Sequence, residues 1–461
     1  MTIFPPRNRP IAATHRYPDG HVFYRKLTRD FPEIVRGEGC YLWDDQGRQY
    51  LDGSGGAFVA NIGHGVREIA AAIGEQAARI AYLTGAAFTS APAEALATEL
   101  AALAPGDLDH IYFLSSGSEA VEAALKLARQ YWVESGRPDK QDIISLSPGY
   151  HGNTLLAMSA SARPHYATFF REWIVNVHRV PAPLAYHCAC RGSDAACETC
   201  SGAALERKIL EIGPDRIAAF IAEPVGGSST GASVPRPDYW RRVRDICNRH
   251  DVLFIADEVA CGAGRTGTWS ALEPYGVAPD IMTMGKGIAG GYTPLSAVAA
   301  PRRLVDVIAR GSGALAHAQT FSHHPVLCAA GLATVRYLRE HALVARAATM
   351  GRVLHEKLAA LLDLPHVGDV RGRGMLAGVE LVLDRDTRAL FPRKAKVAER
   401  FTEAALDAGL VVWPNVGHVN GVGDIIMLAP PFIIESAQID ELLTRFRAAY
   451  DASLAGALAS T

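Results

Sequence analysis

Seven short apolar segments between residues 110 and 301 constrain the fold of this chain more than any other feature. Each is apolar or β-branched and is bounded by Gly, Pro or polar residues, as the buried strands of a parallel sheet are. In chain order they read HIYFLSS, DIISLSPGYHG, IVNVHRV, AAFIAEPV, VLFIADEV, DIMTMGKG and LSAVAAP. Segments with helical spacing, such as 117–135 and 236–251, lie between several of them. This alternation predicts an α/β fold with a mostly parallel central sheet.

The two ends of the chain show a different pattern. Residues 33–52 are typical of antiparallel strands joined by the turn Asp45-Gln46-Gly47. The C-terminal part mixes helical stretches (AALLDL, AKVAERFTEAALDAG) with strand-like ones (LAGVELV, IIMLAPP). We therefore expect a smaller α+β domain built from residues 1–75 and 331–461. Residues 76–330 would form the large domain, with a cysteine-rich insertion at 185–202.

Composition and charge exclude several classes of protein. Apolar residues make up 49% of the 461 residues, which is enough for a large core. The net charge of −2, with both signs interspersed, provides no basic surface for nucleic acid. No apolar run is long enough to span a bilayer, and residues 1–20 lack the apolar core of a signal peptide. We expect a soluble, cytoplasmic protein without nucleic-acid or membrane partners.

Small polar residues follow the first predicted strand, at the edge of the sheet where parallel strands place their chemistry. Ser116, Gly117 and Ser118 stand between that strand and a helix start, where backbone N–H groups can bind a phosphate. An ordinary helix cap made by Ser116 and Glu119 explains the same residues equally well.

Charged and aromatic residues at the other strand ends are ambiguous when taken one at a time. Asp257 could pair with a cationic ring nitrogen or be a simple strand-end charge, and Glu223 ends a second strand in the same way. Tyr150 and His151 suit a flat ring stacked on a side chain. Lys286 is the one lysine in the mostly apolar, glycine-rich stretch 280–298.

In combination and in this order, six motifs resemble those of the class III aminotransferases, which are pyridoxal phosphate (PLP)-dependent enzymes of fold type I. The motifs are Ser-Gly-Ser-Glu-Ala (116–120), Tyr-His-Gly (150–152), Ala-Glu-Pro (222–224), Asp-Glu-Val with Gly-Arg-Thr-Gly (257–267), Lys-Gly (286–287) and Thr-Phe-Ser-His-His-Pro (320–325). The resemblance covers nearly the whole chain. It implies a large domain and a small one, a PLP cofactor and aminotransferase activity.

The resemblance also implies a role for each strand-end residue. Lys286 forms a Schiff base with PLP and then carries protons, and a desolvated site would favour its neutral amine. Asp257 keeps the pyridine nitrogen protonated, while Tyr150 and Val259 flank the ring. Glu223 orients nearby groups, such as Asp257 or an arginine. His151 has only a structural place in this scheme.

The phosphate of PLP would be bound by the first of these motifs. Ser116, Gly117 and Ser118 hold it in the same chain, and Thr320 completes the site from a neighbouring subunit. The resemblance therefore implies a homodimer, or a dimer of dimers, with shared active sites.

The substrate pocket is less determined by the resemblance. Phe58, Tyr82 and Trp413 are the expected wall residues, with Phe88 as a further candidate. Many ω-transaminases carry an arginine for the substrate carboxylate in the region that here reads Val-Val-Trp-Pro (411–414). Its absence leaves His418 or Arg265 as substitutes. The apolar pocket favours an amine or an ω- or β-amino acid as donor, with a keto acid such as pyruvate as acceptor, in ping-pong half-reactions.

Two other functions stay open at this stage. A decarboxylase-transaminase, racemase or phospho-lyase of the same family would use the same lysine, aspartate and phosphate motif. A non-catalytic protein with the fold would have no need of Lys286 and Asp257, so their presence argues against it.

Four of the eight cysteines lie within thirteen residues, in the stretch YHCACRGSDAACETCSG. Cys188-x-Cys190 and Cys197-x-x-Cys200 have the spacing of a tetrahedral zinc site, with His187 as an alternative ligand. A disulfide pair, redox-active thiols or four plain cysteines would give the same spacing. Any metal here would be structural.

Overall fold

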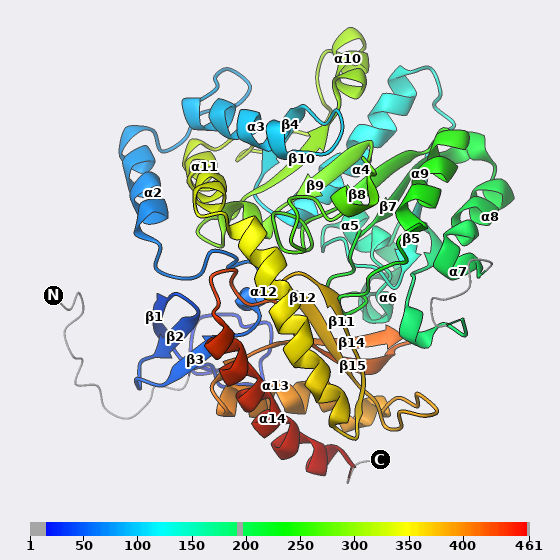
Figure 1. Cartoon of the computed structure of the whole chain (residues 1–461). Helices are drawn as coiled ribbons and strands as arrows, with labels where there is room; N and C mark the ends of the chain where they lie inside the picture. The colour runs from blue at the N-terminus through cyan, green and yellow to red at the C-terminus, as the bar shows by residue number, and fades with distance from the viewer. Residues whose placement is uncertain (1–14, 191–196, 459–461) are drawn as a thin grey trace.

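A seven-stranded sheet forms the centre of the molecule, with the strand order β4-β10-β9-β8-β7-β5-β6 (Figure 1). The computed structural model describes residues 15–190 and 197–458. Strands β6, β5, β7, β8 and β9 are parallel to one another, whereas β10 is antiparallel to β9 and to β4. The strands are β4 (His110–Leu114), β5 (Asp142–Ser147), β6 (His178–Pro181), β7 (Ile217–Ala222), β8 (Leu253–Asp257), β9 (Ile281–Met284) and β10 (Ser296–Ala300). The predicted strands and the mostly parallel sheet are confirmed.

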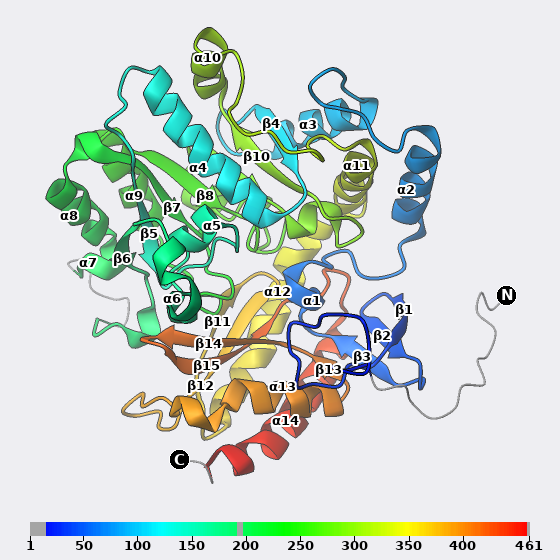
Figure 2. The same cartoon turned by 180° about the vertical axis from the view of Figure 1, so that it is seen from behind.

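Helices cover both faces of this sheet because neighbouring residues of a strand point to opposite sides. Phe220 and Phe254 pack with α8 (Ala203–Ile212) and α9 (Tyr239–Arg249), while Ile221 and Ile255 pack with α4 (Gly117–Glu134). Helix α4 lies in front of the sheet in Figure 2, which views the molecule from behind. Burial on both faces explains why these strands are continuously apolar in sequence.

The two ends of the chain meet in a smaller sheet of order β1-β2-β3-β13. Strand β13 (Leu410–Val411) is parallel to β3 (Gln49–Asp52), and the antiparallel pair of β3 and β2 (Tyr41–Asp44) is joined by the expected turn. The first strand is β1 (Ile34–Glu38). N-terminal and C-terminal residues therefore share one sheet, below the central sheet in Figure 1.

A third sheet, of order β11-β12-β15-β14, is built from the C-terminal residues alone. Its strands are β11 (Val367–Arg373), β12 (Leu376–Leu381), β14 (Trp413–Val419) and β15 (Val422–Leu428), and the helices beside it are α12 (Leu343–Leu358), α13 (Val397–Asp407) and α14 (Ser436–Leu458). The stretch AALLDL forms the 3-10 turn η6 (Ala359–Asp363) directly after α12, and not a long helix.

The expected domain boundaries at 75 and 330 fall inside helices α2 (Arg67–Arg79) and α11 (Pro325–Glu340), and they stay predictions. The remaining helices are α1 (Gly55–Phe58), α3 (Ala91–Leu103), α5 (Leu155–Ala160), α6 (Pro164–Phe170), α7 (Glu198–Ser201) and α10 (Arg302–Arg310). The remaining 3-10 turns are η1 (Arg171–Trp173), η2 (Ala185–His187), η3 (Pro214–Arg216), η4 (Glu273–Tyr275), η5 (Lys286–Ala289) and η7 (Arg393–Ala395). Within residues 15–190 and 197–458, no helix is long and apolar enough to cross a membrane.

The carboxyl ends of β5, β7, β8 and β9 meet at one edge of the central sheet because these strands are parallel. Strand β4 ends at the same edge, since it and β9 are both antiparallel to β10. The residues that follow these strands are therefore brought together from five distant parts of the sequence.

Candidate active site

Lys286 stands two residues beyond the end of β9, as the first residue of η5. Its backbone has a φ of 46°, in the left-handed region that residues other than glycine rarely adopt and that often marks functional sites. The amine Nζ lies 5.2 Å from the centre of the Phe58 ring. Burial lowers the pKa of the Lys286 amine, and the nearby negative charges of Asp257 and Glu223 partly oppose that shift.

Asp257 ends β8, and its buried carboxylate is held by three donors. His151 Nδ1 lies 2.7 Å from Oδ2, while Thr283 Oγ1 and the Val259 backbone N–H donate to Oδ1 at 3.1 and 3.2 Å. Both carboxylate oxygens are thus fixed in place by hydrogen bonds from three separate parts of the chain.

The next residue, Glu258, points elsewhere. Its carboxylate accepts hydrogen bonds from Ser270 Oγ and from the Ala271 backbone N–H. Burial raises the pKa of this carboxyl group to about 7. Of the two adjacent acids, only Asp257 lines the cavity that contains Lys286.

The start of α4 forms another wall of the site. Ser116 caps the helix: its Oγ accepts from the Glu119 backbone N–H, and Glu119 in turn accepts from the Ser116 backbone N–H. The simple helix cap is therefore present. The N–H groups of Gly117 and Ser118 precede the first intrahelical bond, as is usual in the first turn of a helix. A Cβ at Gly117 would stand 2.8 Å from a methyl group of Val259, so only glycine allows this close approach.

Tyr150 and Glu223 lie side by side in the same site. The Tyr150 backbone N–H donates to Glu223 Oε2 at 3.1 Å, and the Gly227 N–H donates to Oε1 at 2.8 Å. Arg163 lies over the Tyr150 ring, with its guanidinium carbon 4.9 Å from the ring centre. It donates to the backbone and side-chain oxygens of Ser228, at 2.6 and 2.8 Å.

These residues enclose one cavity of about 150 Å³. Its lining combines an amine, two carboxylates, an aromatic ring and a helix N-terminus. The lining residues are Gly117, Ser118, Tyr150, His151, Gly152, Glu223, Ser228, Asp257, Val259, Ala260 and Lys286. Five of the six sequence motifs therefore converge on a single place, with Ser116 just outside the lining.

Phe58 and Trp413 lie together beside Lys286. Their rings meet edge to face with centres 5.8 Å apart, and the Phe58 side chain is buried. Both belong to one apolar cluster that joins α1 to the third sheet. They lie where an apolar wall beside the amine was expected.

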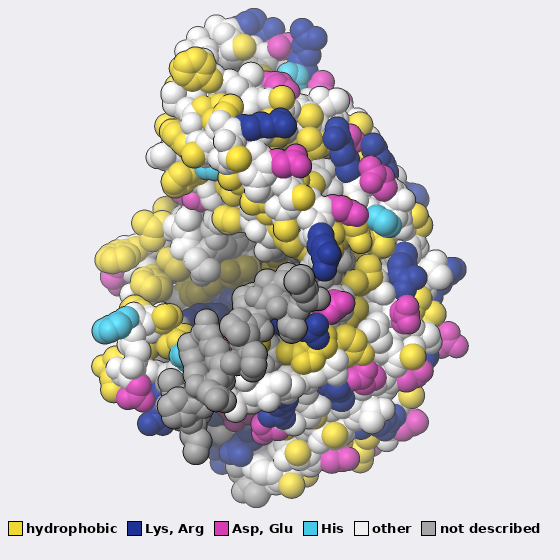
Figure 3. Space-filling model, turned by 90° about the vertical axis from the view of Figure 1, so that its left-hand side faces the viewer, with side chains coloured by type: hydrophobic (Ala, Val, Ile, Leu, Met, Phe, Trp, Pro, Cys, Tyr) yellow, Lys and Arg dark blue, Asp and Glu magenta, His cyan; other side chains and the backbone are white. Residues whose placement is uncertain are grey.

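Tyr82, Phe88 and Thr320 do not line this cavity in their own chain. Tyr82 and Phe88 are 45% and 67% exposed, and Tyr82 packs edge to face on Phe321 at 6.1 Å. Thr320 is also exposed. Figure 3 shows hydrophobic side chains around a hollow on the side of the molecule that carries α2 and β1. A contribution of these three residues to an active site thus requires a second subunit, and it stays a prediction.

The two proposed substitutes for a carboxylate-binding arginine are engaged elsewhere. Arg265 is buried and donates to the backbone oxygens of Met375 and Pro430. His418 is buried against Glu380, with Nε2 2.8 Å from Oε1. Neither residue lines the Lys286 cavity. Arg163, which no sequence motif marked, is the arginine that lies beside it.

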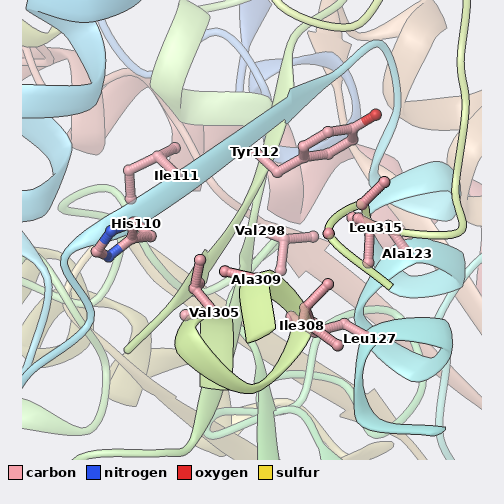
Figure 4. A pocket seen from close by; sticks show the side chains of 13 residues that line it. His110, Ile111, Tyr112, Ala123, Leu127, Val298, Val305, Ile308, Ala309 and Leu315 are labelled. Atoms are coloured by element: carbon pink, nitrogen blue, oxygen red, sulfur yellow. The ribbon is translucent and has the colours of Figure 1, made fainter. Parts of the chain in front are cut away.

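A second pocket, of about 310 Å³, lies at the β4 edge of the sheet between α4 and α10 (Figure 4). Its lining is mainly aliphatic, and the Tyr112 hydroxyl donates to the His317 backbone oxygen. No lysine, arginine or carboxylate lines it among the residues that the structure describes. The chemistry therefore belongs to the cavity around Lys286.

The sheet, the covering helices and the lysine–aspartate cavity at the carboxyl edge define an α/β aminotransferase of fold type I. The model of the family "Aminotransferase class-III" matches residues 25–450, and the chain belongs to this family. PLP is the cofactor that membership implies.

Similar proteins include a putrescine–pyruvate aminotransferase and several ω-transaminases. A putrescine–pyruvate aminotransferase from Pseudomonas aeruginosa is 36% identical over 443 residues, covering 95% of this chain and 94% of the relative. An (S)-enantioselective ω-transaminase from Thermomicrobium roseum has a TM-score of 0.86 at 37% identity, covering 92% and 93% of the two chains. An ω-transaminase from Pseudomonas jessenii in complex with PMP, the aminated form of PLP, has the same TM-score at 32% identity and the same coverage.

Proposed function

We propose that this protein transfers an amino group from an amine, or from an ω- or β-amino acid, to a keto acid such as pyruvate. The observation that carries the proposal is the convergence of Lys286, Asp257 and the α4 N-terminus on one cavity, with Phe58 5.2 Å from the Lys286 amine and Trp413 packed on Phe58. The similarity to a putrescine–pyruvate aminotransferase and to ω-transaminases supports the same class of donor.

The donor groups of the cavity suit PLP. Gly117 and Ser118 would present helix N-terminal N–H groups to a phosphate, and the absence of a Cβ at Gly117 lets Val259 pack closely against this helix end. The Asp257 carboxylate suits a protonated pyridine nitrogen, and Tyr150 and Val259 suit the two ring faces. When bound, PLP would accept the electron pair released as the C–H bond next to the substrate nitrogen breaks.

Lys286 would act as the base and then as the acid. Because burial lowers the pKa of its amine, the neutral form is populated closer to neutral pH than in an ordinary lysine. A neutral Nζ can take a proton from the substrate carbon and return it at another carbon. Phe58 and Trp413 would exclude water and leave no charged partner for a second carboxylate on the donor side.

Arg163 is the residue that we propose for the carboxylate of the keto acid. It lies against Tyr150 and Ser228, both of which line the cavity, and its Nε is buried without a partner among the described residues. Arginine pairs with carboxylates through two parallel hydrogen bonds. The position of Arg163 therefore supports a carboxylate receptor near the cavity, although the 411–414 region carries no arginine.

A homodimer is part of the proposal, with Thr320 of one subunit completing the phosphate site of the other. Thr320 is exposed in its own chain, and its neighbour Gln319 donates to Ser115 Oγ and Glu119 Oε1 at the start of α4. The segment thus lies next to the N-terminus of α4, at the surface, where the proposed phosphate site would be.

The test uses the purified protein with PLP, a panel of amines and pyruvate. We expect amine-dependent conversion of PLP to PMP without pyruvate, and stoichiometric alanine with it, and both are lost in Lys286→Ala. The control is Lys394→Ala, at an exposed lysine outside the cavity. Release of carbon dioxide or phosphate without net alanine would instead indicate a decarboxylase or phospho-lyase, and racemised product a racemase.

A further inference from the structure

The four clustered cysteines bring their sulfur atoms close together. None of these cysteines lines the Lys286 cavity. The Sγ atom of Cys188 lies 3.3 Å from that of Cys190 and 3.5 Å from that of Cys197, and Cys190 Sγ lies 3.3 Å from Cys200 Sγ. All four sulfurs are within 4.8 Å of one another.

We propose that Cys188, Cys190, Cys197 and Cys200 bind one structural zinc ion. A tetrahedral zinc ion with Zn–S bonds of about 2.3 Å requires sulfurs about 3.8 Å apart. The three separations given above, 3.3, 3.5 and 3.3 Å, are slightly shorter than that value, and all four sulfurs lie within 4.8 Å of one another. A small outward shift of the side chains therefore makes room for the ion, with the four thiol protons released to water.

The geometry favours a metal over disulfides. A disulfide requires two sulfurs at about 2.05 Å. One disulfide among these four cysteines would leave the other two as thiols packed against it. Here each sulfur has neighbours on more than one side: Cys188 contacts both Cys190 and Cys197, and Cys190 also contacts Cys200. Four sulfurs that converge in this way can all bind one metal ion, whereas a redox-active pair needs only two sulfurs close to each other.

Local structure holds the ligands in place from two sides. Cys188 directly follows η2, where its N–H donates to the Leu184 backbone oxygen at 2.9 Å. Cys197 and Cys200 flank and form the short helix α7, and Cys200 is buried. Ser201 and Gly202 then lead into α8. Gly202 packs closely on α9, since a Cβ at this position would lie 3.2 Å from Val243. One half of the site is thus anchored on the helices that cover the central sheet.

The other half is anchored on the third sheet. His187, next to Cys188, is hydrogen-bonded to Glu380 of β12, and Arg388 Nη1 donates to the Tyr186 backbone oxygen at 2.6 Å. A zinc ion that joins Cys188 and Cys190 to α7 therefore fixes the His187 contact as well. The proposed role is to hold the central sheet and the third sheet together through residues 185–190 and 197–200.

A neighbouring group of possible ligands, His187, Glu380 and His418, does not call for a metal. Arg371 Nη1 lies 2.6 Å from Glu380 Oε2, so a fixed cation already balances this buried carboxylate. Both histidines bond to the other oxygen of the same carboxylate. The metal is therefore assigned to the thiols.

The experiment measures zinc in the full-length protein, purified without a metal column and dialysed against a metal-free buffer. We expect about one zinc per chain in the wild type and in the control Cys247→Ala, whose thiol is buried in α9. The double variant Cys188→Ser/Cys197→Ser should retain less than about a tenth of that amount, since two thiolates cannot hold a tetrahedral site.

A second measurement does not depend on how well the variant folds. Wild-type protein stripped of metal and given Co²⁺ alone should develop the intense sulfur-to-cobalt absorption of a tetrahedral thiolate site, and zinc should displace it. Thiol titration in denaturant and intact mass, both before stripping, distinguish free thiols from disulfides. Eight titratable thiols indicate that all cysteines are reduced, whereas a mass lower by two hydrogens indicates one disulfide. Absence of both zinc and the cobalt spectrum, or a native disulfide among these cysteines, overturns the proposal while leaving the aminotransferase assignment untouched.

Discussion

His151 Nδ1 lies 2.7 Å from Asp257 Oδ2, and both side chains are almost completely buried. Since a carboxylate only accepts hydrogen bonds, the Nδ1 atom carries the proton. Thr283 and the Val259 backbone hold the other oxygen. His151, for which the sequence indicated only a structural place, is therefore a positioning residue for the acid that faces the cavity.

Replacing His151 by Ala should lower kcat by about 10- to 100-fold, because a hydrogen bond to a charged group is worth about 1.5–3 kcal/mol. The Kd for PLP should rise in parallel. His151→Asn keeps a donor near Oδ2 and should recover part of both losses. Steady-state kinetics and PLP titration at one pH measure them. Equal losses in the two variants, with PLP affinity unchanged, would contradict a positioning role.

Lys286 should react as a neutral amine at lower pH than an exposed lysine, because burial lowers the pKa of its amine. Asp257 opposes this shift, so Asp257→Asn removes a charge that favours the ammonium form and should move the midpoint further down. Competitive acylation of the PLP-free protein, followed by peptide mass spectrometry across pH, measures the midpoint, with the exposed Lys394 as internal reference. A midpoint that moves up in Asp257→Asn would refute this electrostatic account.

The strand-end residues could be predicted from the sequence because each follows a short apolar run, and parallel strands bring their ends to one edge. Lys286, Asp257, Glu223 and Tyr150 became candidates in this way, and the resemblance to class III aminotransferases then gave each its expected role. Arg163 could not be found, because it follows α5 in a segment with no pattern, and only the folded chain brings it onto the Tyr150 ring.

Other limits of the sequence have different physical causes. The adjacent acids Asp257 and Glu258 have the same chemical character, so the sequence does not distinguish them. In the structure, Asp257 points into the cavity and Glu258 points to Ser270. Tyr82 was expected near the substrate from the resemblance to the family, yet in a single chain it lies on the surface. When an active site is shared between subunits, the local sequence around a residue does not tell whether that residue serves the site of its own chain or that of the partner.

Trp413 and Phe58 should limit the size of the amine donor, since their rings meet 5.8 Å apart beside Lys286. Trp413→Ala should raise the ratio of kcat/KM for a bulky aryl amine to that for a small linear amine by at least about tenfold, as expected for space equivalent to a few methylene groups. Trp173→Ala, at an exposed tryptophan, is the control. An unchanged ratio would place the substrate on another side of the cavity.

Arg163 should bind the keto acid. Arg163→Gln removes a charged partner for the carboxylate, so KM for pyruvate should rise by about 10- to 100-fold. KM for an uncharged-tail amine should change little, and Arg163→Lys should lie between the two because lysine lacks the planar pair of donors. Arg393→Gln is the matched control: Arg393 lines a hollow beside Arg163, but its guanidinium is paired with Glu399. A larger effect in the control would move the carboxylate site to Arg393.

Thr320 should complete the phosphate site of the partner subunit and not that of its own chain. Lys286→Ala abolishes chemistry in both sites of a dimer, and Thr320→Ala should weaken PLP binding by about tenfold, the effect of losing one hydrogen bond to a charged group. A mixed dimer of the two variants then contains one site with both defects and one with neither, provided that Thr320 acts across the interface. We therefore expect that mixing and re-equilibrating the two inactive or weakened proteins at limiting PLP restores up to half of the wild-type activity per dimer. If Thr320 acts within its own chain, every site of the mixed dimer keeps one defect, and activity per dimer at limiting PLP is about half that of the Thr320→Ala dimer, because the other site lacks Lys286.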